Sequence, residues 1–415
     1  MFACPGEGEC WRSPNVSFHF PNAPQDSVDN PSARSKVLHT IERLPGVLMP
    51  QNISSLSLPK LNIFFQSQRA SVDGQSNAHL VQFIKSAKKT LDCAIYDFKQ
   101  QDVLDVLKSV SKKVKLRIAY DGGKRKAVTG GAKADPKPPG TEDALRKSGL
   151  LKFATAIHTA GGHLMHSKYI VRDASSVWTG SGNWTHGGLE LQDNSFLAID
   201  SVPLAAAYTS NFEGLLATDH IHPANPKKVS ASFIMARPPI KVGSVALSLF
   251  FSGHGTEEIE TAVIALIQKA NKLRIIAMLI SDPGILQALT AFKPARKDIA
   301  GVLDPHEMKQ VMKPPHGKSK VPASMFWFAN GDKRFVAALS HAFSPNDNND
   351  FMHNKVMIID DRTVITGSYN FSENAESNDE NMLIIHSARV AAAYNRYFNA
   401  LQAQYKKHGA PLPPV

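Results

Sequence analysis

Two stretches of the sequence, HSKYIVRDASSVWTGSGN at His166–Asn183 and HNKVMIIDDRTVITGSYN at His353–Asn370, share one spacing of chemically distinctive residues. Both follow the pattern His-x-Lys-x4-Asp-x6-Gly-Ser-x-Asn. Six positions fixed in this way recur by chance in a chain of this length with a probability on the order of one in 100,000. Cores rarely retain His and Lys for packing, so the repeat indicates duplicated chemistry rather than duplicated packing alone.

The segments around the two motifs also repeat in the same order, which indicates a duplicated architecture. Apolar strands at Leu61–Phe65 and Leu247–Phe251 each precede an expected helix, a buried strand and a shorter helix. A further strand ends in Asp121 in the first half and in Asp304 in the second, and a long loop is expected after each. This order predicts an α/β protein with two lobes, each a mixed β-sheet flanked by helices, related by pseudo-twofold symmetry.

The boundaries of these parts follow from composition. We expect a poorly structured N-terminal tail at residues 1–57, with a short helix near Ala33–Leu44. A first lobe at 58–221 and a second at 243–407 are joined by a linker at 222–242 that is rich in Pro and Lys, and residues 408–415 form a C-terminal tail.

Charge and cysteine usage narrow the class of protein. The 415 residues carry 47 Lys and Arg against 36 Asp and Glu, a net charge of +11. This excess favours polyanionic partners such as nucleic acid or anionic lipid, although an unspecialised basic surface has the same composition. Cys4 and Cys10 can pair within the tail and Cys93 belongs to the core, so no disulfide framework follows.

No segment resembles a signal peptide or reaches the roughly 18 apolar residues of a membrane span. We therefore expect a soluble, cytoplasmic protein. Because both motifs lie in one chain, a monomer suffices to build the site.

Residue geometry within the motifs points to one phosphate-binding pocket. His and Lys at positions i and i+2 of a strand point to the same face of a sheet, and a turn at Asp173 or Asp360 returns the following Ser and Asn beside them. Lys and Asn side chains can neutralise non-bridging phosphate oxygens, serine hydroxyls can add donors, and two histidines can divide attack and proton transfer. The candidate catalytic residues are His166, Lys168, Asn183, His353, Lys355 and Asn370, with Ser181 and Ser368 in support.

A nucleophilic imidazole also needs an acceptor on its second nitrogen. Asp193 follows His166 by 27 residues, and Glu380 follows His353 by the same 27 residues. We expect these carboxylates to orient the imidazoles; solvated acids beside a turn are the alternative.

These residues resemble the phospholipase D superfamily, and the resemblance covers Leu58 to Lys407. It implies two α/β lobes facing a cleft, covalent phosphohistidine catalysis, and no metal or other cofactor. It further implies that His166 is the nucleophile, that His353 is the general acid and base, and that Asp173 and Asp360 are structural supports. The second half, TGSYNFSENAESNDEN, resembles the bacterial nuclease branch, whereas the first departs from it at Gly182 and Asp193.

The family does not fix the substrate, and three functions stay open. Two basic loops, one with Lys124, Arg125, Lys126, Lys133 and Lys137 and one with Lys309, Lys313, Lys318 and Lys320, favour a nucleic-acid backbone. The alternatives are a phospholipase D that releases phosphatidic acid from a glycerophospholipid and a non-catalytic nucleic-acid-binding protein.

Three further features need an interpretation. The apolar stretch Met325–Phe328 is expected to be a buried strand rather than a lipid-binding lip. His158 and His163 are expected behind the site or on the surface, because no set of Cys, Asp or His around His163 and His166 completes a metal coordination sphere.

Overall fold

The computed structural model describes residues 53–124, 140–159, 163–218, 220–221, 227–253, 257–292, 298–314, 317–329, 333–342, 344 and 349–413. The expected helix near Ala33–Leu44, the pair Cys4 and Cys10, and most of the first basic loop lie outside these ranges. So do residues 222–226 of the expected linker.

The first half of the chain builds one mixed sheet and its helices. Its elements are β1 (Ser55–Leu58), β2 (Leu61–Ser67), β3 (Val72–Asp73), α2 (Ser76–Lys85), β4 (Thr90–Ile95), α3 (Gln101–Val110), β5 (Lys115–Lys124), α4 (Thr141–Ser148), the 3₁₀-helix η2 (Leu151–Phe153), β6 (Ala154–Thr159), β7 (Lys168–Arg172), β8 (Ser176–Gly180), the π-helix η3 (Gly187–Leu191), β9 (Asn194–Asp200), α5 (Val202–Thr218) and β10 (His220–Ile221).

The second half repeats this plan after a short helix. Its elements are α6 (Ala231–Met235), β11 (Ile240–Val242), β12 (Val245–Phe251), α7 (Glu258–Lys269), β13 (Lys272–Ala277), α8 (Pro283–Ala291), β14 (Asp298–Leu303), α9 (Pro305–Met312), the 3₁₀-helices η4 (Ala323–Ala329) and η5 (Glu373–Glu376), β15 (Phe335–Ala337), β16 (Lys355–Ile359), β17 (Thr363–Gly367), β18 (Asn381–His386) and α10 (Ala388–His408).

The two sheets have the same strand order. The first is β1-β2-β9-β8-β7-β4-β5-β6-β10 with β3 paired to β2, and the second is β11-β12-β18-β17-β16-β13-β14-β15. Parallel pairing joins β4, β5, β6 and β10 in the first sheet and β13, β14 and β15 in the second, while the motif hairpins β7-β8 and β16-β17 pair antiparallel. The predicted pair of mixed α/β lobes with pseudo-twofold symmetry is confirmed.

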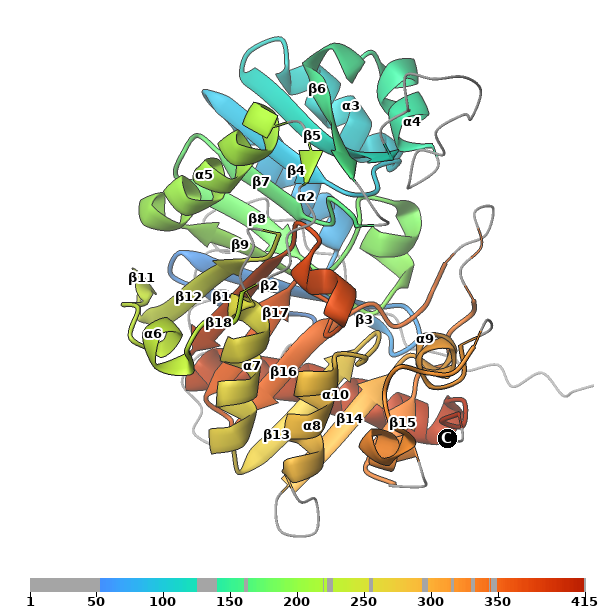
Figure 1. Cartoon of the computed structure of the whole chain (residues 1–415). Helices are drawn as coiled ribbons and strands as arrows, with labels where there is room; N and C mark the ends of the chain where they lie inside the picture. Colours follow the sequence, from blue (N-terminus) through green and yellow to red (C-terminus); the bar gives the residue numbers. More distant parts are fainter. Residues whose placement is uncertain are drawn as a thin grey trace, which may run out of the picture. The chain divides into compact units, whose positions relative to one another are not determined.

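Three apolar clusters hold these layers together. Helices α2 and α3 bury their apolar stripes against one face of the first sheet, and α7 and α8 do the same on the second sheet (Figure 1). The opposite faces of both sheets share a third cluster with α5 and α10, to which Tyr208 and Phe212 contribute from α5 and Tyr394 and Tyr397 from α10. A common core therefore joins the halves, and residues from both halves can be held in one site.

The motif hairpins turn where the sequence predicts. Asp173 and Ala174 both have positive φ, at 53° and 52°, as do Asp360 and Asp361 at 50° and 54°. Two consecutive left-handed residues define the tight turn that suits the twist of a hairpin, and Asp tolerates this conformation.

The motif aspartates also tie the hairpins to neighbouring strands. The Asp173 carboxylate accepts hydrogen bonds from the backbone N–H groups of Lys88, Lys89 and Thr90, and Asp360 accepts from Asn271 and Lys272. Burial alone raises the pKa of Asp173, but these donors outweigh it and lower the pKa. Both aspartates thus lie at the far end of their hairpins from the histidines.

Several local expectations need correction. Strand β5 runs to Lys124, with an irregular register between Asp121 and Lys124. No loop directly follows Asp304, because its side chain accepts the N–H groups of His306 and Glu307 and caps α9, with Pro305 in the first turn. The Met325–Phe328 stretch lies in 3₁₀-helix η4 rather than in a strand, and Phe326 is buried in the core of the second lobe.

The structure also adds detail at the expected boundaries. Strand β1 begins at Ser55, before the expected start of the first lobe, and pairs with β2. The described part of the expected linker contains α6 and β11, and β11 is the edge strand of the second sheet. Cys93 is buried with a free thiol, as expected.

Candidate active site

Two backbone contacts between the halves bring the motifs together. The His166 N–H donates to the Asp379 carbonyl at 2.9 Å, and the His353 N–H donates to the Asp193 carbonyl at 3.1 Å. Short parallel bridges, Met165 to Asp379 and Asp193 to Met352, flank these bonds. Each histidine is therefore positioned by the segment that precedes the last strand of the other half, and the two motifs form one site.

The two lysines occupy matching positions in the site. Lys168 Nζ donates to the His166 carbonyl and Lys355 Nζ to the His353 carbonyl, both at 2.6 Å. Each lysine is only 1% exposed. The ring of Tyr96 lies 5.2 Å from Lys168 Nζ and 4.9 Å from the His166 ring, so it covers the first histidine and lysine together.

Burial controls the protonation of this cluster. It lowers the pKa of Lys168 to about 7, although Glu380 and other nearby carboxylates oppose the change. It lowers the pKa of Lys355 well below its usual range, and repulsion from Lys168 adds to the effect. Burial, together with the charges of the two lysines, also lowers the pKa of His166 and His353 well below 6.5, so both imidazoles are neutral at neutral pH.

The Nδ1 atoms of the two imidazoles have hydrogen-bond partners of different charge. His166 Nδ1 lies 2.8 Å from Glu380 Oε2, whereas His353 Nδ1 lies 3.1 Å from Asn194 Oδ1. Asn194 Nδ2 donates to the Gly188 carbonyl and to Gln192, so its oxygen must face the imidazole. An amide oxygen only accepts, and His353 Nδ1 therefore carries a hydrogen and leaves Nε2 with its lone pair.

Asp193 does not contact the imidazole of His353 in this arrangement. Its Oδ2 accepts the Tyr405 hydroxyl of α10 at 2.7 Å, and only its backbone carbonyl meets His353. Asp379 is its counterpart, since Asp379 Oδ1 accepts the Asn211 amide of α5 at 2.9 Å. Burial raises the pKa of Asp193 to about 7 despite hydrogen bonds from Ser67 and Tyr405. Each aspartate anchors the long helix of one half to the site.

A π-helix explains why equal sequence spacing selected the wrong residue. Gly180 pairs with Phe196 and Gly367 pairs with Met382, so the first half has one residue more between its motif and its last strand. The extra residue is accommodated in η3, and single inserted residues commonly produce π-helical turns near functional sites. Asn194, not Asp193, is consequently the structural counterpart of Glu380.

Glycines at two positions allow η3 and the motif loop to pack closely. A Cβ on Gly188 would lie 2.3 Å from the Asn183 carbonyl oxygen, and a Cβ on Gly182 would lie 2.3 Å from the Phe196 ring. The second half has Tyr369 at the position of Gly182, so the two motif loops differ in the size of this side chain.

The motif serines are hydrogen-bonded to the partners of the histidines, whereas the motif asparagines lie at the edge of the site. Ser181 Oγ donates to Asn194 Oδ1 at 2.7 Å, and the Ser368 hydroxyl bonds to Asn381 and Glu380, so the serine hydroxyls orient the histidine partners. Asn183 and Asn370 are partly exposed, two residues beyond these serines. Their Oδ1 atoms are buried without a hydrogen-bond partner.

Among the described residues, no group of three or more His, Cys, Asp or Glu side chains is arranged to hold a metal ion. His158 and His163 lie outside the hydrogen bonds described above, and His163 is partly exposed. No helix in the described part of the chain is long and apolar enough to cross a membrane.

Comparison with known proteins assigns this architecture to a family. The model of the family described as cardiolipin synthase, PLD-like domain, matches residues 80–216 and 263–402, once in each lobe and over more than half of the chain. The chain therefore belongs to this family of the phospholipase D superfamily.

Individual relatives are more distant. The chain is 25% identical over 143 residues to a mitochondrial cardiolipin hydrolase of Chlamydomonas reinhardtii, a match that covers 34% of this chain and 57% of the relative. The phosphatidylserine synthase of Haemophilus influenzae has a similar fold, with a TM-score of 0.54 and 14% identity over 84% of this chain and 88% of that one. The phospholipase D family member Nuc of Salmonella typhimurium matches 39% of this chain and 96% of its own, with 25% identity and a TM-score of 0.29.

Proposed function

We propose that the enzyme hydrolyses phosphodiesters through a covalent phosphohistidine at His166, with His353 as general acid and then general base. The unequal pairing of the two imidazoles carries this assignment. When His166 Nε2 attacks phosphorus, positive charge develops on the ring, and the Glu380 carboxylate on Nδ1 stabilises that charge. Asn194 offers no charge, so the nucleophile is the histidine that faces the carboxylate.

His353 transfers the protons in this scheme. His353 is neutral in the free enzyme, and the negative charge of a bound phosphodiester favours its uptake of a proton from solvent. A protonated imidazole beside a neutral amide is a stronger acid than one beside a carboxylate, and it gives its proton more readily to the leaving oxygen as the P–O bond breaks. Neutral His353 then takes a proton from water, whose oxygen attacks phosphorus and breaks the bond to His166. The products are an alcohol, a phosphomonoester and the free enzyme.

Four side chains hold the phosphate while these bonds change. Lys168 and Lys355 supply positive charge, and Asn183 and Asn370 supply amide donors to the non-bridging oxygens. Burial lowers the pKa of both lysines, and the negative charge of a bound substrate opposes this effect, so substrate binding raises their pKa values. Substrate binding and lysine protonation are coupled.

A nucleic-acid backbone is the substrate that we favour. Strand β13 ends at Ala277, which pairs with Lys355 on one side and with Leu303 on the other, so α9 begins beside the site. Lys309 on α9 and Lys313, Lys318 and Lys320 beyond it are exposed. A series of exposed lysines that starts at a phosphodiester site suits a long polyanion.

A phospholipid is the second candidate, because the family description and the curated relative are both named for cardiolipin. Purified enzyme in excess EDTA should cleave labelled single-stranded or duplex DNA, and a His166→Ala variant should not. Cleavage only of cardiolipin or other phospholipid in vesicles would replace the first substrate with the second. If the enzyme turned over neither DNA nor phospholipid, both proposed substrates would be wrong, while the family assignment would stand.

A further inference from the structure

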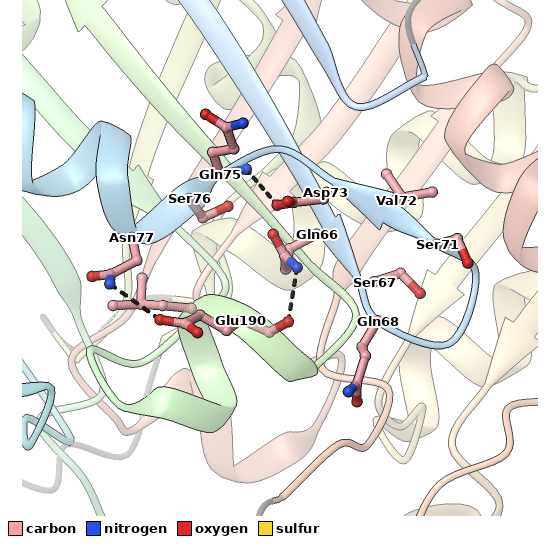
Figure 2. Close-up of a pocket in the computed structure, with 11 residues that line it drawn as sticks. Gln66, Ser67, Gln68, Ser71, Val72, Asp73, Gln75, Ser76, Asn77 and Glu190 are labelled. Atoms are coloured by element: carbon pink, nitrogen blue, oxygen red, sulfur yellow. Dashed lines mark hydrogen bonds between the residues drawn. The ribbon is translucent and has the colours of Figure 1, made fainter.

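A pocket of about 500 Å³ lies in the first lobe, between the end of β2, strand β3, the start of α2 and the π-helix η3 (Figure 2). Eleven residues line it, and none is Lys, Arg or His. Asp73 and Glu190 are its two charged residues. The pocket is therefore polar and carries negative charge, unlike the lysine-rich catalytic site.

Two amide side chains of the pocket have fixed orientations. Gln66 Nε2 donates to the Glu190 carbonyl at 2.8 Å, and Asn77 Nδ2 donates to the carboxylates of Asp102 and Glu190 at 2.9 and 3.1 Å. Carbonyl and carboxylate oxygens only accept hydrogen bonds, so the amides cannot be rotated. Their oxygens, Gln66 Oε1 and Asn77 Oδ1, are buried without a hydrogen-bond partner.

A buried hydroxyl adds to this set of acceptors. Ser76 is 1% exposed and Gln66 is 5% exposed, and the Ser76 hydroxyl also lacks a partner. In Figure 2 the Ser76 hydroxyl points from the start of α2 toward the Gln66 amide on β2, with the Asp73 carboxylate nearby. A buried polar atom without a partner costs free energy, and such atoms in native structures commonly mark a ligand or a function.

The missing partner must be a hydrogen-bond donor and is best positively charged. A primary ammonium group has three N–H donors and no acceptor, and its charge matches Asp73 and Glu190. A polyol can donate O–H groups but has no charge to match Asp73 and Glu190, and a quaternary ammonium has no N–H to donate. We propose that the pocket binds a primary ammonium group on a short carbon chain, with Gln66 Oε1, Ser76 Oγ and the Asp73 carboxylate as its acceptors.

The pocket lies close to the candidate active site, but none of the motif histidines, lysines or asparagines lines it. Gln66 on β2 pairs with Asn194 on β9, and the two side chains bond to neighbouring carbonyls of η3, Glu190 and Gly188. Asn194 lies between the pocket and His353. An occupant of the pocket is thus held behind the partner of one imidazole, and the proposal stands whether or not the chain cleaves nucleic acid.

Two substitutions test the acceptors without removing a hydrogen bond of the protein. Ser76→Ala deletes an oxygen that has no partner, and Asp73→Asn removes the charge while retaining an oxygen that can accept from the Gln75 N–H. Asp105→Asn is the matched control, since Asp105 is an exposed acid on α3 of the same lobe and outside this pocket.

Ligand-observed NMR titration of the full-length His166→Ala protein with ethanolamine measures the binding without turnover. Ethylene glycol, which replaces the ammonium by a hydroxyl, is the neutral comparison. We expect saturable binding of ethanolamine and little binding of ethylene glycol. The affinity for ethanolamine should be about ten-fold weaker in Asp73→Asn and in Ser76→Ala, since loss of one hydrogen bond to a charged group lowers affinity by about that factor. The Asp105→Asn control should bind like its parent.

The source of the ammonium is settled by a second arm with vesicles of phosphatidylethanolamine in phosphatidylcholine. Competition between these vesicles and free ethanolamine would assign the pocket to a lipid headgroup, and lack of competition would assign it to a free amine. Equal binding of ethylene glycol and ethanolamine, no saturable binding of ethanolamine, or unchanged affinity in Asp73→Asn and Ser76→Ala would overturn the proposal.

Discussion

His353 Nδ1 lies 3.1 Å from Asn194 Oδ1, one residue beyond the aspartate that the repeat spacing selects. The corresponding nitrogen of His166 faces the Glu380 carboxylate at 2.8 Å. Two histidines in equivalent motifs therefore experience different electrostatic surroundings.

Replacing Asn194 by Asp should alter the titration of His353. A carboxylate on Nδ1 stabilises the imidazolium, so the pKa of His353 should rise and the alkaline limb of the kcat profile should move to higher pH. The rate at the optimum should fall about ten-fold or more, because a general acid held by a carboxylate is weaker. A pH profile of kcat measures both effects.

Asp193→Asn is the matched control for this change. Asp193 bonds to Tyr405 and not to an imidazole, so its replacement should leave the pH profile in place. A shift with Asp193→Asn and none with Asn194→Asp would mean that the aspartate, not the amide, controls His353.

Glu380→Gln should slow the attack of His166. The amide retains a hydrogen-bonding atom near Nδ1 but cannot stabilise positive charge, and we expect kcat to fall by about 10² to 10³ with little change in KM. Burial raises the pKa of Glu380 to about 7, so wild-type activity should decline as the pH falls below 7 and the carboxylate becomes protonated. Stopped-flow measurement of the first turnover separates this step from product release; an unchanged rate of the first step would exclude Glu380 from catalysis.

Asp173→Ala should reduce stability without a matching loss of activity. Three backbone N–H groups lose their acceptor, which we expect to cost about 1–3 kcal/mol in the free energy of unfolding. Asp173→Asn retains an acceptor and tolerates the positive φ, so it should cost less. Urea denaturation and kcat of the folded fraction give both quantities. A large loss of kcat with intact stability would instead place Asp173 in the chemistry.

A partly buried group of acids in the second lobe should make stability depend on pH. Burial, with repulsion from Asp282 and nearby glutamates, raises the pKa of Glu260 to about 8. The folded state binds a proton there between about pH 4.5 and 8 while the unfolded state does not, so this group makes stability fall as the pH rises through that window.

Glu260→Gln should therefore raise the melting temperature at pH 8.5 and have little effect at pH 5.5, where the wild-type carboxyl is already neutral. Glu142→Gln, in an exposed ion pair with Arg146, is the control and should show no such pH dependence. An equal change at both pH values would attribute the effect to packing rather than charge.

Much of the architecture follows directly from the sequence. The duplicated motif fixes two hairpins because Asp173 and Asp360 accept the left-handed turn, and alternation of strands and helices fixes the mixed sheets. The motif also locates His166, Lys168, His353 and Lys355, whose side chains lie on matching positions in the two lobes. Local patterns suffice for these features.

Other features depend on spacing that a repeat alone does not reveal. The π-helix at Gly187–Leu191 shifts the first half by one residue, and counting from His166 therefore selected Asp193 instead of Asn194. Aligning the final strands on Phe196 and Met382 would have exposed the shift. The start of α9 was missed although Asp304 followed by Pro305 is a common signal for a helix N-terminus.

The covalent step itself is the most direct test of the account. Rapid quench of the enzyme and a ³²P-labelled phosphodiester substrate in alkaline denaturant, in which a phosphohistidine is stable, followed by peptide mapping at alkaline pH, should locate the label on His166 in the wild type. His353→Ala should still form this phosphoenzyme with a substrate whose leaving group needs no proton, such as a p-nitrophenyl ester, and should release it slowly. His166→Ala should form none. Label on His353 in the wild type, or a labelled His166→Ala protein, would contradict the assignment of the nucleophile to the histidine that faces Glu380.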